Sequence, residues 1–230
     1  MISHKHKCIF IHISKCAGSS VENAFGVFKN EPDSLNALRG WDEKHKLYLQ
    51  HATPQQLMDL KLITKSQWDS YYKFIVYRNS WSKLLSDYLW VSRGHKIDDS
   101  FENFLLKKGK FTDILTDNSN HHYCGDHLYN QKDYFFLDGN RINYDLEINF
   151  DAVNDGFNSV IKDLGLEPNF FDKKDNSTNY EKAHYSYLYS LKSKNLVKRL
   201  YQEDIAYFNF RFENRSIIPL FFNQWCRMTV

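Results

Sequence analysis

Short apolar runs rich in β-forming residues recur at four places along the chain. They cover residues 8–13, 74–77, 134–137 and 144–150. The first three are almost continuously apolar and do not alternate with polar residues. Strands that are buried on both faces, as in a parallel sheet covered by helices, have this pattern. The pattern therefore predicts a sheet of mainly parallel strands.

Apolar residues at helical spacing occupy the stretches between these runs. They predict helices near residues 19–28, 81–89, 100–108, 154–164 and 196–205. A further helix start is marked by Thr53, Pro54 and Gln56, which supply an N-cap, a proline at the first helical position and the partner of a capping box. Strands that alternate with helices predict an α/β fold. No repeat or Pro/Gly-rich linker divides the sequence, so we expect a single domain over residues 1–230.

Composition excludes several classes of protein. The chain has 230 residues with 17% aromatic residues, which is too aromatic for a disordered chain. Its net charge of +2 gives no field that would recruit nucleic acid, and no segment approaches the ~20 apolar residues of a membrane span. The four cysteines, Cys8, Cys16, Cys124 and Cys226, form no CxxC pair and predict thiols in a reducing cytoplasm. A lumenal domain trimmed from a larger protein is the alternative location.

The loop after the first apolar run carries the candidate chemistry. Residues 14–20 read S-K-C-A-G-S-S and lead from a buried strand into a helix. Such a turn directs several backbone N–H groups and the positive helix end toward one point. Gly18 allows an anion to approach the backbone, Ser19 and Ser20 add hydroxyl donors, and Lys15 adds a positive charge. The loop predicts a phosphate or sulfate site, or it is an ordinary strand–turn–helix connection.

The loop differs from a Walker A motif, in which lysine follows the second glycine. Here Lys15 precedes Gly18. This order argues against a magnesium-dependent triphosphate site.

The second apolar run repeats this arrangement. It ends at Arg78, and a helix follows. Because the carboxyl ends of parallel strands meet at one edge of a sheet, Arg78 is expected on the same edge as Lys15. Ser86 lies off the apolar stripe of the helix. A guanidinium and a hydroxyl suit a second phosphate, whereas a capping arginine and a solvated serine are the alternative.

Together these two segments resemble the sulfotransferases that use 3′-phosphoadenosine 5′-phosphosulfate (PAPS). The stretch from Phe10, F-I-H-I-S-K-C-A-G-S-S, resembles their 5′-phosphosulfate loop, F-I-H-I-P-K-T-A-G-T-S. Arg78 and Ser86 resemble their 3′-phosphate motif. The carbohydrate-type branch, with its heparan and chondroitin sulfotransferases and bacterial relatives, is the most similar. The resemblance extends over residues 8–212. Cys16 stands where the family has threonine, and a thiol is a weaker hydrogen-bond donor.

The resemblance implies a three-layer, P-loop-like fold with a central, mostly parallel sheet flanked by helices. It implies transfer of a sulfuryl group from PAPS to a hydroxyl of a glycan or glycolipid, with no metal required. Lys15 would stabilise the leaving phosphate, and His51, at the family's histidine position, would be the general base. The residues expected to bind the donor are Lys15, Cys16, Ala17, Gly18, Ser19, Ser20, Arg78 and Ser86.

Other histidines have competing interpretations. Asp126 and His127, in a block that also resembles the family, are a second candidate base or a contact to the acceptor. His12 falls within an apolar run and is expected to be a hydrogen-bonded core residue. The pair His121–His122 could suggest a metal with Cys124 and His127, but adjacent side chains are expected to diverge, so no metal site is predicted.

Two other functions stay open from the sequence. One is a nucleotide or phosphate kinase on a related fold, and the other is a non-catalytic nucleotide-binding module. Neither the acceptor nor the oligomeric state follows from the sequence.

Overall fold

The computed structural model describes residues 1–31, 33–171 and 184–215. Within it the chain divides into two compact units. Unit 1 comprises Met1–Arg78 and Ile114–Asp175, and unit 2 comprises Asn79–Asp113 and Asn176–Val230. Whether the two make one domain, as the sequence predicts, stays a prediction. Cys226 lies outside the described residues.

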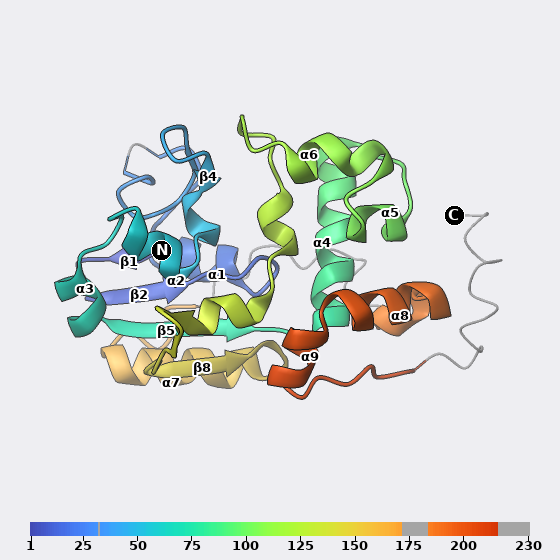
Figure 1. Cartoon of the computed structure of the whole chain (residues 1–230). Helices are drawn as coiled ribbons and strands as arrows, with labels where there is room; N and C mark the ends of the chain where they lie inside the picture. The colour runs from blue at the N-terminus through green and yellow to red at the C-terminus, as the bar shows by residue number, and fades with distance from the viewer. Residues whose placement is uncertain (32, 172–183, 216–230) are drawn as a thin grey trace. The chain divides into compact units, whose positions relative to one another are not determined.

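Unit 1 is built on a four-stranded, mostly parallel sheet, as predicted (Figure 1). Its order is β1 (Ile2–Ser3), β2 (Cys8–Ile11), β5 (Tyr72–Tyr77), β8 (Leu146–Asn149). The pairs β2–β5 and β5–β8 are parallel, and β1 is an antiparallel edge strand that the sequence pattern did not reveal. All four residues of β2 are buried, which explains their continuous apolar run.

The apolar run at residues 134–137 does not join this sheet, so that part of the prediction is wrong. Its first half lies in a 3-10 helix, Gln131–Phe135. Its second half, β6 (Phe136–Leu137), pairs antiparallel with β7 (Asn140–Arg141). The turn between these strands is Asp138–Gly139, and both residues have positive φ. An Asp-Gly turn of this kind closes a two-residue hairpin. A second hairpin joins β3 (Trp41–Asp42) to β4 (Leu47–Tyr48).

The helices of unit 1 begin and end at recognisable signals. They are α1 (Gly18–Ala24), α2 (Pro54–Asp59), α3 (Lys65–Ser70) and α7 (Val153–Leu164). The predicted capping box at Thr53 and Gln56 is present, and α7 ends at Gly165, whose φ of 61° is left-handed. In α7, a Cβ on Gly156 would lie 2.4 Å from Ile148, so the missing side chain lets the helix approach β8 closely.

Unit 2 is helical. It contains α4 (Ser80–His95), α5 (Phe101–Leu105), α8 (Leu191–Leu200) and α9 (Gln202–Tyr207), and the short α6 (Thr112–Thr116) begins in it. The long helix expected near residues 196–205 is two helices, because Tyr201 leaves the helical conformation at φ −116° and ψ 32°. Aromatic residues form the core, which contains Tyr88, Phe101, Phe104, Phe111 and Tyr189.

A buried ion pair in α4 was not predicted. Lys83 Nζ lies 2.8 Å from Asp87 Oδ2, and both side chains are almost wholly inaccessible. The face of α4 opposite the predicted apolar stripe is therefore partly buried as well. Ser86, between the two, is half-buried.

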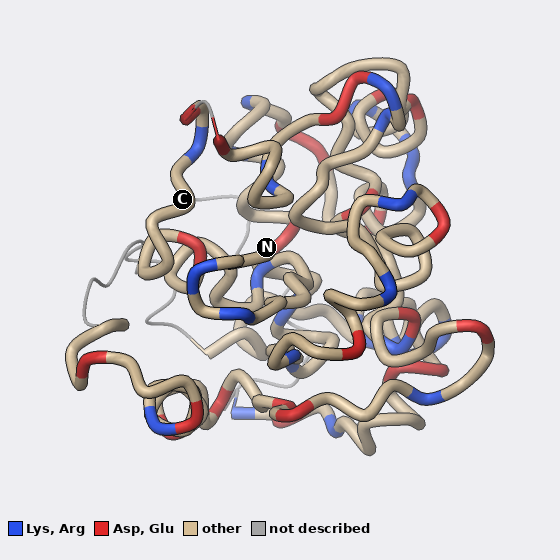
Figure 2. Tube along the Cα trace, turned by 90° about the vertical axis from the view of Figure 1, so that its left-hand side faces the viewer, with Lys and Arg blue, Asp and Glu red and all other residues tan. Residues whose placement is uncertain are grey.

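Charges are mixed along the chain. Lys and Arg are interspersed with Asp and Glu over the residues that the structure describes (Figure 2). In the described part of the chain, no helix is long and apolar enough to cross a membrane. Cys8, Cys16 and Cys124 are buried thiols outside any disulfide.

Candidate active site

The loop between β2 and α1 has an unusual backbone. Lys15 and Ala17 both have a φ of 59°, a left-handed conformation that costs roughly 1–2 kcal/mol for a residue with a side chain. Ala17 is the N-cap of α1 and offers no side-chain acceptor to the first N–H groups of the helix. A backbone that includes left-handed residues can turn successive N–H groups toward one point and bind an anion. Ser19 is exposed and Ser20 half-exposed, so both hydroxyls are accessible to a ligand.

Gly18 is required for a packing reason that the sequence did not reveal. A Cβ at this position would lie 1.7 Å from Nε2 of His12 and about as close to two ring carbons. The imidazole of His12 therefore packs directly against the start of α1. That Gly18 also lets an anion approach the backbone stays a prediction.

The side chain of Cys16 points into unit 1. It is fully buried, and its Sγ lies 4.0 Å from Oε1 of Gln131. The hydroxyl of Ser14 donates to the carbonyl of His127 at 3.5 Å. The loop is thus anchored to the segment around residues 127–131. The thiol of Cys16 is thus turned away from a donor, and its backbone N–H donates to the carbonyl of Ile13 at 3.2 Å.

Arg78 lies against this loop, as the parallel topology predicts. Its Nη1 donates to the carbonyl of Lys15 at 3.1 Å. Its guanidinium stacks on the ring of Phe150, 4.1 Å from the ring centroid. These three residues follow β2, β5 and β8, so the carboxyl ends of three parallel strands bring them to one edge of the sheet. Ser86 belongs to unit 2, and its part in the site stays a prediction.

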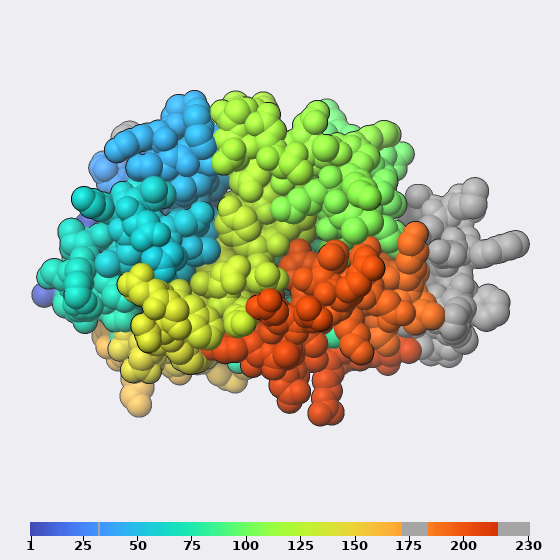
Figure 3. All heavy atoms as spheres, in the orientation of Figure 1, coloured from blue at the N-terminus to red at the C-terminus, as the bar shows by residue number. Residues whose placement is uncertain are grey.

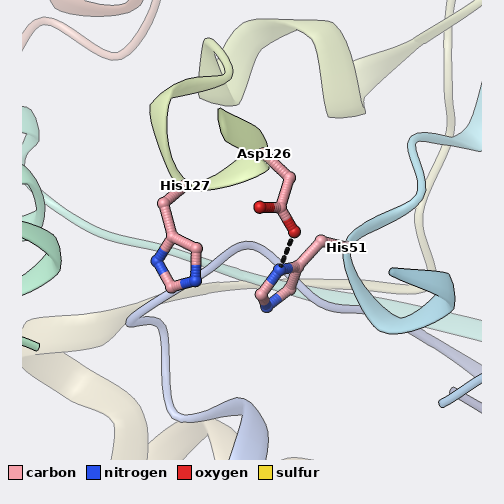
Figure 4. A group of neighbouring side chains, drawn as sticks. All are labelled: His51, Asp126 and His127. Carbon is pink, nitrogen blue, oxygen red and sulfur yellow. Dashed lines mark hydrogen bonds and ion pairs between the residues drawn. The ribbon is translucent and has the colours of Figure 1, made fainter. Parts of the chain in front are cut away.

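His51 and Asp126 form a hydrogen-bonded pair (Figure 4). Nδ1 of His51 lies 2.5 Å from Oδ2 of Asp126, although the residues are 75 positions apart in sequence. An ionised carboxylate only accepts hydrogen bonds, so Nδ1 of His51 is the donor and Nε2 is left outside this hydrogen bond. The sequence named the two residues separately, as rival candidates for one role. The structure joins them.

The backbone of His51 is also hydrogen-bonded to the part of the chain that follows Asp126. The segment around residue 50 (blue to cyan) lies beside the segment around residues 120–135 (yellow-green) in the space-filling view (Figure 3). Tyr134 donates its hydroxyl to the carbonyl of His51 at 2.8 Å, and Tyr144 donates to the carbonyl of Tyr134 at 2.5 Å. His51 is the last residue of the 3-10 helix Leu49–His51, and the N-cap of α2, Thr53, follows two residues later.

Asp126 is ionised despite its burial. Burial alone would raise its pKa, but the charge and hydrogen bond of His51, with a smaller effect of His127, hold the pKa below the usual range of a carboxyl. Within the described residues, its second oxygen, Oδ1, has no hydrogen-bond partner. The ring of His127 lies 5.0 Å from that of His51 (Figure 4). A buried carboxylate oxygen without a hydrogen-bond partner thus accompanies two imidazole rings in this cluster.

His12 is a buried core residue, as predicted. Its Nδ1 lies 2.9 Å from Glu22 Oε1, and the other carboxylate oxygen of Glu22 lies 3.1 Å from Arg39 Nε. Burial lowers the pKa of His12 to about 4, against the opposing effect of Glu22. Burial would raise the pKa of Glu22, but His12 and Arg39 lower it to about 2. The His12 ring centroid is 4.8 Å from that of His51.

One group in the described residues has the geometry to hold a metal ion. His51, Asp126 and His127 each offer a ligand atom, and these atoms lie within 4.8 Å of one another. His121 and His122 do not belong to it. Their rings lie side by side with centroids 4.1 Å apart, so the expectation that they diverge is wrong. That catalysis needs no metal stays a prediction.

Gln131, which was not predicted from the sequence as a site residue, binds the backbone of Arg78. Its Oε1 accepts from the backbone N–H of Arg78 at 2.9 Å, and its Nε2 donates to the carbonyl of Arg78 at 2.8 Å. The only signal was its place in the block that resembles the family.

The comparison with protein families now identifies the class. Residues 1–211 match the model described as "Sulfotransferase family". The chain belongs to the sulfotransferase family, as the resemblance predicted. No curated protein and no solved structure matches it.

Proposed function

We propose that this sulfotransferase moves the sulfuryl group of PAPS to a hydroxyl of a glycan or glycolipid. The observation that carries the proposal is the contact between Arg78 and the Lys15 carbonyl. It joins the two predicted anion sites at the edge of one parallel sheet. A donor with a 5′-phosphosulfate and a 3′-phosphate needs two such sites close together.

In this proposal the loop binds the phosphosulfate. Backbone N–H groups of residues 16–20, of which that of Cys16 also donates to the Ile13 carbonyl, hold its oxygens together with the hydroxyls of Ser19 and Ser20. Arg78 and Ser86 bind the 3′-phosphate, and the ring of Phe150 supports the guanidinium from one face. Because the Cys16 side chain is buried, its thiol does not need to replace the threonine hydroxyl of the family pattern.

The transfer step requires a base and stabilisation of charge. The acceptor oxygen attacks sulfur, the bond from sulfur to the 5′-phosphate oxygen breaks, and the electron pair stays on that oxygen. Nε2 of His51 takes the hydroxyl proton, and Asp126 stabilises the resulting imidazolium. Lys15 neutralises the charge on the leaving phosphate. His127 contacts the acceptor. No metal takes part in the proposed chemistry.

The proposed enzyme is a single three-layer, P-loop-like domain over residues 1–230 with a cytoplasmic location. The mostly parallel sheet of unit 1 and the helices of both units are compatible with that fold.

Binding of adenosine 3′,5′-bisphosphate, the desulfated donor, tests the donor site. We expect this compound to raise the melting temperature without magnesium, and Arg78→Ala to weaken binding by at least about tenfold, since a charge-assisted contact to phosphate is lost. Stabilisation only by ATP with magnesium would instead indicate a kinase. Transfer of labelled sulfate to a panel of glycans then separates an enzyme from a binding module.

A further inference from the structure

Gln131 is the residue that joins the two ends of the proposed donor site. Its side chain is 1% exposed and lies among three parts of unit 1. The carboxamide contacts the residue that ends β5, the loop after β2 and, through its own chain, the segment that carries Asp126. A buried carboxamide with no hydrogen bonds would be costly, so this placement requires partners on both of its polar atoms.

Those partners are the two backbone groups of one residue. Oε1 accepts from the Arg78 N–H at 2.9 Å, and Nε2 donates to the Arg78 carbonyl at 2.8 Å. The carboxamide thus pairs with Arg78 as a neighbouring strand would. It fixes the peptide units on both sides of the Arg78 Cα, just where β5 ends and the backbone would otherwise be free to turn.

The same carboxamide contacts the anion-binding loop. Cys16 Sγ lies 4.0 Å from the oxygen that accepts from Arg78. Ser14 of the loop donates to the His127 carbonyl, in the segment that leads to Gln131. One carboxamide therefore contacts both the Cys16 side chain and the Arg78 backbone.

We propose that Gln131 is a positioning residue for donor binding, which aims the Arg78 guanidinium at the 3′-phosphate of the donor by clamping the Arg78 backbone. This inference rests on the proposed function. Gln131 itself does not touch the donor. It acts through Arg78, and its loss leaves the guanidinium present but misdirected, because the side chain starts from a backbone that is no longer fixed.

Gln131→Met tests this role, since methionine has a similar length and no polar amide. We expect the dissociation constant of adenosine 3′,5′-bisphosphate and the KM of PAPS to rise about tenfold, as expected for one to two lost hydrogen bonds. The kcat at saturating donor should change much less, because His51 and Asp126 are unaltered.

The matched control is Gln55→Met. Gln55 also bridges to a turn, with Oε1 accepting from the Asp138 N–H at 2.8 Å and Nε2 donating to Asp138 and Asp59. Gln55 is more exposed than Gln131, but its replacement also removes hydrogen bonds from both atoms of a carboxamide elsewhere in unit 1 and should leave donor affinity unchanged. An equal loss of affinity in both variants would assign the effect to general destabilisation and overturn the proposal.

A double-mutant cycle with Arg78→Lys tests the path of action. If Gln131 acts through Arg78, Gln131→Met should weaken binding far less in the Arg78→Lys background than in the wild type. Additive effects would overturn the proposal. Should Gln131→Met not fold, Gln131→Glu takes its place in the cycle, since the effect of its added charge on the donor is present in both backgrounds and cancels. A wild-type protein that does not bind the bisphosphate would reject the proposed function itself, whereas binding unaffected by Gln131→Met would reject this inference alone.

Discussion

Two histidine–carboxylate pairs lie side by side in unit 1, with the rings of His12 and His51 4.8 Å apart. Both pairs are buried, and both join Nδ1 of the imidazole to a carboxylate oxygen. They differ in what surrounds the carboxylate. Both oxygens of Glu22 have cationic or hydrogen-bonding partners, whereas Oδ1 of Asp126 has none within the described residues.

The difference separates a structural histidine from a candidate base. The ring of His12 is packed against Gly18, and its pKa is depressed to about 4, so it stays neutral over the physiological range. The pair of His51 and Asp126 lies next to a second histidine and includes a buried carboxylate oxygen that has no hydrogen-bond partner within the described residues. Burial and hydrogen bonding alone do not mark an active-site histidine, because both rings have them. Unsatisfied polar capacity beside the ring is the more informative feature.

The largest expected effect comes from removing the candidate base. His51→Ala should lower kcat by roughly 10²–10⁴-fold, the usual contribution of general acid–base catalysis, and leave the affinity for adenosine 3′,5′-bisphosphate intact. Initial rates with labelled PAPS, together with the dissociation constant of the bisphosphate, measure both quantities. Turnover at the wild-type rate would remove His51 from this role and erase the contrast with His12.

Exchanging each carboxylate for its amide sharpens the comparison. Asp126→Asn removes the charge that holds the proton on Nδ1 of His51, so kcat should fall on the order of tenfold to a hundredfold. Glu22→Gln should instead cost roughly 3 kcal/mol of unfolding free energy, because Arg39 loses its buried partner, with little change in kcat. Steady-state rates and urea unfolding of both variants decide this. Equal effects of the two changes on kcat would contradict the assignment.

The smallest expected effect is on the pH dependence of stability. His12 has a pKa of about 4 in the folded chain against a usual 6.5, so as pH falls the unfolded chain takes up its proton first. Its contribution is complete above pH 6.5 and is lost as pH falls toward 4. Glu22, with a pKa lowered to about 2 from 4.5, extends the loss below pH 4.5.

The urea concentration at the midpoint of unfolding of the wild type should therefore decrease as the pH is lowered from 7 to 5. His12→Gln, which retains a donor for Glu22 but does not titrate, should show a flatter dependence in this range. An identical slope in the two proteins would show that another group dominates.

Local signals predicted much of unit 1. The continuous apolar runs identified β2 and β5, and the Thr53 capping box marked the start of α2 because these features depend on residues close in sequence. Residues 134–137 were assigned wrongly because a short apolar run does not distinguish a sheet strand from a 3-10 helix and hairpin. The turn signal at Asp138–Gly139 favoured the hairpin and could have been used.

The site was predicted in part for a topological reason. Parallel strands bring their carboxyl ends together, so the meeting of Lys15 with Arg78 followed from the fold. The pairing of His51 with Asp126 did not, because it depends on how two irregular segments pack. The roles of Gln131 and Gly18 were hidden for the same reason. Their partners, Arg78 and His12, are fixed by tertiary contacts that no spacing in the sequence encodes.

Because His12 packs against Gly18, we expect the residues at these two positions to change together among members of the family. The space of a Cβ at the head of α1 is filled by an imidazole that Glu22 prevents from moving aside. A relative with alanine at the place of Gly18 must therefore have a smaller side chain at the place of His12. Covariation of these two positions should therefore be visible across the family whether or not an anion also approaches this glycine.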